Sequence, residues 1–160
     1  MRDRIELRAQ NPVARCLLGQ LIVPRIYYQV DWPQIADGPI DVLAIDRDGV
    51  GEAHLVDIRR NAPDALARIA RLHKARAPFR WVAFLKGTED ETTVATLNAQ
   101  EILYPADTAG RIGVFEIVEI AGGDLGANIR IKAERFPTPS YDLAAAFIAS
   151  HQATIQFGGA

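Results

Sequence analysis

Residues 41–60 hold charged side chains inside two apolar runs, and this feature constrains the fold more than any other in the chain. Asp41 comes directly before the apolar residues 42–45, whereas Asp57 and Arg59 alternate with apolar neighbours in residues 55–60. Apolar runs and alternation predict two strands, and Asp48-Gly49 between them suits a tight turn that needs positive φ. Ionised groups in such surroundings are costly unless they are paired or bind a metal. The segment therefore predicts a hairpin that can hold a divalent cation beside a phosphate.

This hairpin resembles the core of a known enzyme superfamily. The order Gly38-Pro39-Ile40-Asp41, an apolar strand, a glycine turn and Val56-Asp57-Ile58-Arg59 is similar to the restriction-endonuclease-like, or PD-(D/E)XK, nucleases. The resemblance implies that Asp41 and Asp57 bind Mg2+ or Mn2+, and that Arg59 completes a catalytic set where the family has lysine. Arginine keeps its proton at working pH, so Arg59 can hold a phosphate but cannot act as a general base.

The resemblance also raises the question of an upstream glutamate, which many family members supply from the first helix. The residues between Pro12 and Val23 include no acidic side chain. The candidates are Glu6, which comes before the expected helix, and Gln20, which offers no charge.

The first half of the chain predicts the same order of helices and strands as the core of that superfamily. Asn11-Pro12 favours a helix start with Asn11 as the cap, and Pro24 favours its end. Residues 25–30 form a further expected strand, Asn61 begins a second helix, and residues 79–85 form a strand that should pair in parallel after this helical crossover. We therefore expect an α/β (α+β) fold: a restriction-endonuclease-like core with a mixed central sheet flanked by helices.

The second half predicts an extension of the same domain. We expect a helix at residues 92–103, a β-hairpin from residues 111–120 and 128–136, and a last helix at residues 141–151. Residues 121–126 hold three glycines that a hairpin turn explains better than a phosphate loop, and residues 154–157 could add an edge strand. The chain is thus interpreted as one domain, 1–160, with the core in 1–90 and the extension in 91–160.

Composition narrows the function classes. A net charge of -2 and a pI near 5.9 argue against a general basic coat for nucleic acid, although a local basic patch stays open, notably on the basic outer face expected for the second helix. The single cysteine, Cys16, excludes an internal disulfide. Since there is no signal core and no apolar run long enough to cross a bilayer, we expect a cytoplasmic protein without a membrane partner.

Each candidate has an ordinary structural alternative. Asp57 and Arg59 share one face of their strand and could neutralise each other without a metal. The three histidines lie too far apart in sequence for a zinc motif. Asp46, Asp48 and Glu52 could be solvated in a turn, and Cys16, Trp32 and Trp81 could pack in the core. Tyr27, Tyr28 and Trp32 could alternatively stack on a base.

Two function classes follow. The first is a divalent-metal-dependent nuclease that hydrolyses phosphodiester bonds of DNA or RNA. The second is a catalytically inactive nuclease-like module that binds nucleic acid or a protein partner, which includes a second copy of the chain.

Overall fold

The structure is a computed structural model that describes residues 4–19, 24–46, 53–103, 110–137 and 155–156. The helices in this part of the chain are α1 (Arg4–Arg8), α2 (Gln10–Leu18), α3 (Ala62–Ala67), α4 (Ile69–Lys74) and α5 (Glu91–Leu103). The strands are β1 (Pro24–Val30), β2 (Ile40–Asp46), β3 (Ala53–Ile58), β4 (Phe79–Leu85), β5 (Gly113–Glu119), β6 (Leu125–Ile131) and β7 (Ile155–Gln156). None of the described helices is long and apolar enough to cross a bilayer.

One mixed sheet joins the described strands in the order β6-β5-β4-β3-β2-β1-β7. Strands β1, β2 and β3 form an antiparallel meander, β4 and β5 continue the sheet in parallel, and β6 pairs antiparallel with β5. The parallel pairing of β3 and β4 confirms the expected helical crossover, and the general α+β class with a mixed sheet and flanking helices is confirmed.

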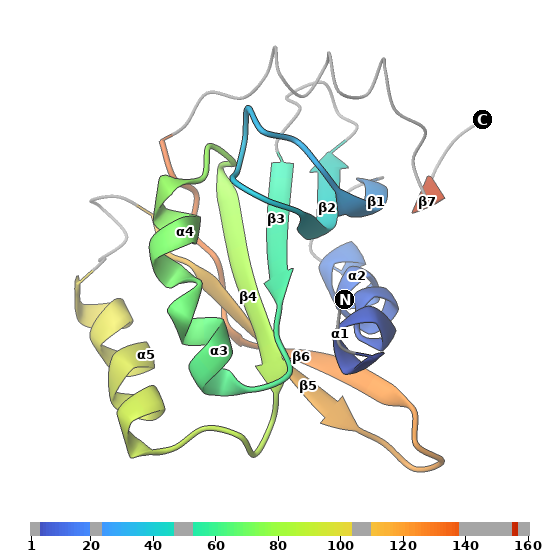
Figure 1. Ribbon diagram of the computed structural model, residues 1–160, viewed down its shortest axis with the longest axis vertical. Coiled ribbons are helices and arrows are strands. Elements are labelled where there is room, and N and C mark those ends of the chain that lie inside the picture. Colours follow the sequence, from blue (N-terminus) through green and yellow to red (C-terminus); the bar gives the residue numbers. More distant parts are fainter. Residues whose placement is uncertain (1–3, 20–23, 47–52, 104–109, 138–154, 157–160) are drawn as a thin grey trace.

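Helices cover both faces of this sheet (Figure 1). Ala9 and side chains of α2 join a core cluster with Val42, Val56 and Trp81 on one face. Side chains of α3, α4 and α5 join Leu55, Val82 and residues of the loop 31–39 on the other. Because β3 and β4 bury both faces, their sequences are almost continuously apolar, as a central parallel pair requires.

The predicted start of the first helix was wrong. Asn11 lies inside α2, which begins at Gln10, and the N-cap residue Ala9 makes no side-chain cap bond. The reason is that α1 runs almost directly into α2: Ala9 N donates to Ile5 O at 2.9 Å and Val13 N donates to Ala9 O at 3.0 Å. The amides that an asparagine cap would satisfy are therefore already bonded. The helix also ends earlier than predicted, at Leu18, with Gly19 as its C-cap.

The second helix starts as predicted. Asn61 is the N-cap of α3, and its side chain accepts a hydrogen bond from Asp64 N at 2.8 Å. The expected single helix is divided at Arg68 into α3 and α4.

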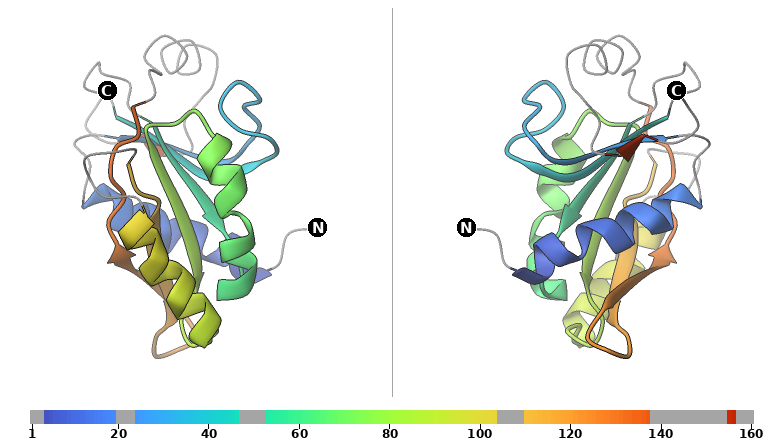
Figure 2. Two further views of the ribbon diagram at one scale, coloured as in Figure 1. Left: turned by 90° about the vertical axis from the view of Figure 1, so that its left-hand side faces the viewer. Right: turned by 90° about the vertical axis from the view of Figure 1, so that its right-hand side faces the viewer.

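The C-terminal hairpin is confirmed, with β6 three residues earlier in its start than predicted. Its turn contains Gly122 and Gly123 at positive φ, which most other residues adopt only with strain. The turn lies at the lower end of the molecule in both views of Figure 2. At the opposite edge of the sheet, β7 pairs with β1, as expected for an edge strand. The predicted turn at Asp48-Gly49 and the predicted helix 141–151 lie outside the described residues.

A buried arginine closes the end of α4. Arg80, on β4, donates hydrogen bonds to the carbonyls of Leu72, His73 and Ala77 at 3.1, 3.0 and 2.8 Å. Its guanidinium carbon lies 3.9 Å from the centroid of the Phe136 ring. Burial lowers the pKa of Arg80 to about 10, which leaves the group charged at neutral pH. The last carbonyls of α4 are thus neutralised from inside the molecule.

His54, at the start of β3, is a buried neutral histidine. Trp81 Nε1 donates a hydrogen bond to His54 Nδ1 at 3.1 Å, and the imidazole stacks on Phe79 with ring centroids 4.2 Å apart. Burial lowers the pKa of His54 from 6.5 to about 3. The side chain therefore serves as a hydrogen-bond acceptor in the core.

This shift predicts acid sensitivity. A histidine in the unfolded chain gains a proton near pH 6.5, whereas folded His54 does not until about pH 3, so stability present above pH 6.5 is lost as pH falls through this window. We expect His54 to account for a loss of about 2 kcal/mol between pH 7 and pH 5. Urea unfolding of the wild type and His54→Asn at both pH values measures this, and an equal loss in both proteins would contradict it.

Candidate carboxylate and arginine site

Asp41 and Asp57 lie at the same end of the β2–β3 hairpin, and both are buried. Their exposed fractions are 1% and 0%. Each is the next residue on its strand beyond the paired Val42 and Val56. The expectation that these charges are buried in apolar strands is therefore confirmed. Buried charges need partners that compensate them.

Asp41 is compensated by neutral donors. Its Oδ2 accepts a hydrogen bond from Ile58 N at 2.7 Å, and its Oδ1 accepts one from Gln29 Nε2 at 2.9 Å. The same Gln29 amide nitrogen donates to Gln10 Oε1 of α2 at 3.0 Å. Gln29 has a φ of 52°, a conformation uncommon outside glycine, so β1 adopts a strained backbone where it meets this carboxylate.

Asp57 is compensated by arginines. Its Oδ2 accepts hydrogen bonds from Arg71 Nη1 at 2.6 Å and from Arg68 Nε at 3.2 Å. Its Oδ1 lies 3.5 Å from Arg59 Nη2. One buried carboxylate thus meets three guanidinium groups, two of them from α4 and the junction between α3 and α4.

Arg71 extends this contact to the loop between β1 and β2. It donates through Nε to Asp37 O at 2.5 Å and through Nη2 to Pro39 O at 2.8 Å. A single guanidinium therefore connects the end of β3, α4 and the loop. Charge-assisted bonds of this kind are about twice as strong as neutral ones.

Arg59 connects the site to α1. Its Nη1 lies 3.9 Å from Glu6 Oε1, and Glu6 is buried. Of the two residues considered to complete the set, Glu6 is brought to Arg59, whereas Gln20 lies outside the described residues. Within the described structure, Asp57 Oδ1 and Arg59 Nε are buried without a hydrogen-bond partner.

The carboxylates are arranged with hydrogen-bond donors and guanidinium groups where a divalent cation would have to bind. Mg2+ and Mn2+ need carboxylate oxygens that are free to coordinate. Both oxygens of Asp41 and Oδ2 of Asp57 already accept hydrogen bonds, and Asp57 Oδ1 faces the Arg59 guanidinium, so a cation would have to compete with donors at each oxygen. In agreement, the described part of the chain contains no cluster of three or more His, Cys, Asp or Glu side chains suited to a metal.

Arg68 and Arg71 are the site residues that sequence analysis missed. A basic outer face was expected for the second helix, whereas the structure directs Arg68 and Arg71 to the buried Asp57. A spacing of three residues does put two side chains on one side of a helix. Together with an aspartate among apolar residues at the end of the preceding strand, that spacing was the sequence signal that could have identified Arg68 and Arg71 as its partners.

The other candidates are structural or lie outside the described residues. Tyr27 and Trp32 are buried in the core, which leaves them unavailable for base stacking. Cys16 packs against the other core cluster, and burial raises the pKa of its thiol. Asp48, Glu52 and His151 are not described, and for Asp46 only the backbone, in β2, is.

Comparisons with known proteins bear on the fold alone. No family model and no curated protein matches the sequence. A solved structure, the SPO1766 protein of unknown function from Silicibacter pomeroyi, is similar with a TM-score of 0.58 and 16% sequence identity over 94% of this chain and 88% of that chain. This similarity supports the architecture and carries no activity to this chain.

The arrangement predicts that Asp57 is a stabilising residue. Asp57→Asn should lower the free energy of unfolding by about 3 kcal/mol, because it leaves three partly buried guanidinium groups without their counter-charge. Asp124→Asn, in the exposed hairpin turn, is a matched control with an expected change below about 0.5 kcal/mol. Urea unfolding in chelator measures both variants. A more stable Asp57→Asn protein would show that repulsion between acidic groups dominates, as in a metal site without its metal.

Proposed function

We propose that this chain is a nuclease-like module that binds nucleic acid without hydrolysing it. The observation that carries the proposal is the commitment of the buried Asp57 carboxylate to Arg59, Arg68 and Arg71. In this arrangement the carboxylate acts as a structural counter-ion and is not available as a metal ligand.

The nuclease-like part of the proposal is supported by topology and position. A helix, an antiparallel three-stranded meander, a helical crossover and a parallel strand follow one another in the order that the resemblance implies. Asp41 and Asp57 lie on adjacent strands, and Arg59 follows directly after β3. Glu6 approaches from the helix before the meander.

The absence of hydrolysis is supported by the chemistry of the same residues. Arg59 holds its proton, so it supplies no general base. Three guanidinium groups surround the Asp57 carboxylate, and one of them, that of Arg59, also contacts Glu6, which reduces the attraction of these two carboxylates for a divalent cation.

Nucleic-acid binding is supported by cations near this site. Arg60, which follows Arg59 in the chain, is exposed, and the Arg68 side chain is 35% exposed although it contacts Asp57. Such residues bind phosphates without reading sequence. The net charge of -2 makes any such binding weak and dependent on salt.

A metal-dependent nuclease is the second candidate, and one observation favours it. Asp57 Oδ1 is buried and accepts no hydrogen bond from the described residues, and Arg68 is the most exposed of the three arginines around it. Activity would then require that an arginine leave the Asp57 carboxylate and that a metal cation take its place.

Fluorescence anisotropy tests the binding half of the proposal. Labelled single-stranded DNA, duplex DNA and RNA should bind, with affinity falling about fortyfold between about 50 and 200 mM salt if three phosphates are contacted. Arg60→Gln/Arg68→Gln should weaken binding, whereas Lys132→Gln, at an exposed position directly after β6, should not. Absence of binding at low salt would contradict nucleic acid as the partner and favour a protein partner or a second copy of the chain.

Gel assays of the same substrates with manganese test the catalytic half. We expect no cleavage by the wild type or by Arg59→Lys, and no stoichiometric manganese binding in calorimetry. Cleavage that rises in Arg59→Lys would establish the second candidate, provided that the Asp41→Asn/Asp57→Asn double variant, the control for contaminating nuclease, is inactive.

A further inference from the structure

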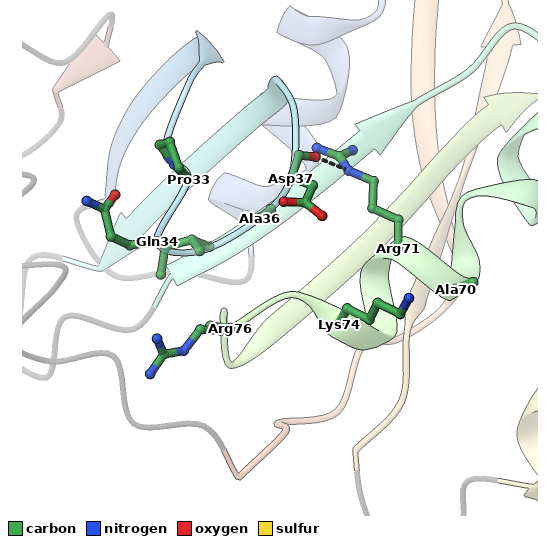
Figure 3. A pocket seen from close by; sticks show the side chains of 9 residues that line it. Pro33, Gln34, Ala36, Asp37, Ala70, Arg71, Lys74 and Arg76 are labelled. Carbon is green, nitrogen blue, oxygen red and sulfur yellow. Dashed lines mark hydrogen bonds between the residues drawn. The ribbon is translucent and has the colours of Figure 1, made fainter.

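A pocket lies between the loop that joins β1 to β2 and the helix α4, and Arg71, which bonds Asp57, is among its lining residues. It has a volume of about 310 Å³. Pro33, Ile35, Ala36 and Ala70 contribute apolar lining, and the charged lining residues are Asp37, Arg71, Lys74 and Arg76. Figure 3 shows the Asp37 carboxylate directed between the loop and α4, with Lys74 on the α4 side and the Arg76 side chain extending away from both. The pocket thus combines a small apolar floor with charged groups at its rim.

The pocket is held in shape by contacts that need no ligand. Arg76 N donates to Ile35 O at 2.8 Å, and Arg71 holds Asp37 O and Pro39 O. Loop and helix are therefore fixed relative to each other on two sides. Preformed sites lose less entropy when they bind a ligand.

The electrostatics favour an anion. Three cationic side chains and one carboxylate line the pocket, and Arg71 shares its charge with Asp57. The C-terminal end of a helix normally repels anions, but here Arg80 occupies the carbonyls of Leu72 and His73. Lys74 and Arg76 are exposed, so they can reorient toward a ligand.

The volume of the pocket and the Asp37 carboxylate restrict the chemical class of the ligand further. A volume of about 310 Å³ is at the lower end of small-molecule sites, which span about 300–1,000 Å³. A carboxylate accepts hydrogen bonds from hydroxyl or amino groups and repels a bare anion. We infer that this pocket binds a phosphate monoester with hydroxyl groups beside the phosphate, such as a sugar phosphate or the 5′-phosphorylated end of a nucleotide or oligonucleotide. The inference does not require the proposed function.

Amide NMR titration with four probes tests the inference: ribose 5-phosphate, ribose, inorganic phosphate and a 5′-phosphorylated oligonucleotide. Ribose 5-phosphate should shift the amides of residues 34–37 and 70–76 and bind more tightly than ribose or inorganic phosphate. Lys74→Gln/Arg76→Gln should weaken it about tenfold or more, whereas the matched Lys132→Gln should leave it unchanged.

Asp37→Asn tests the selectivity. It should raise the affinity for inorganic phosphate, because it removes the repulsion between the Asp37 carboxylate and the anion. It should also lower the preference for ribose 5-phosphate over inorganic phosphate, because an amide oxygen accepts hydrogen bonds from hydroxyl groups less strongly than a carboxylate. Binding of the oligonucleotide alone would identify a strand end as the source of the phosphate, and binding of both probes would identify a free ligand as sufficient. Absence of shifts at these residues with any phosphate probe, or equal weakening by Lys132→Gln, would overturn the inference. Since the small probes contain no strand, this failure is distinguishable from a failure of nucleic-acid binding.

Discussion

The ion pair between the buried Asp57 carboxylate and Arg71 is the contact on which the arrangement around the site depends. Asp57 has no exposed surface, and the 2.6 Å bond from Arg71 is the shortest of its contacts. A buried carboxylate costs several kcal/mol unless a partner compensates it. Because Arg71 also holds two carbonyls of the loop between β1 and β2, that compensation fixes the sheet, α4 and the loop at once.

The same contact separates two surfaces with different chemistry. On one side lie Asp41, which accepts hydrogen bonds from neutral donors, and Glu6 and Arg59, which lie close enough to pair. On the other side lies the pocket beneath Asp37, where cations are exposed. Arg71 both bonds Asp57 and lines the pocket, so it links the stability of the fold to the geometry of the pocket. Substitution of Arg71 would change both, which is why exposed neighbours are the better probes of binding.

Sequence patterns predicted the elements whose signals are local. The strand Phe79–Leu85 has the bounds expected from its apolar run, and the Asn61 cap forms because its partner amide, Asp64 N, is three residues away. The expected cap at Asn11 failed because α1 had already satisfied the amides in question. Burial of Asp41 and Asp57 was predictable from their apolar neighbours. The approach of Arg59 to Asp57 was also predictable, from their shared strand face. The contacts of Arg68 and Arg71 with Asp57 were not, because a helical side chain turns inward or outward according to how the helix packs on the sheet.

A double-mutant cycle on Asp57→Asn and Arg71→Gln measures the central interaction most directly. Unfolding free energies of the wild type, both single variants and the double variant give the coupling between the two side chains free of their separate contributions. A coupling of about 2 kcal/mol or more is expected for a buried, hydrogen-bonded ion pair. A coupling near zero would contradict the role of this pair as the anchor of the site and would leave Asp57 available for other ligands.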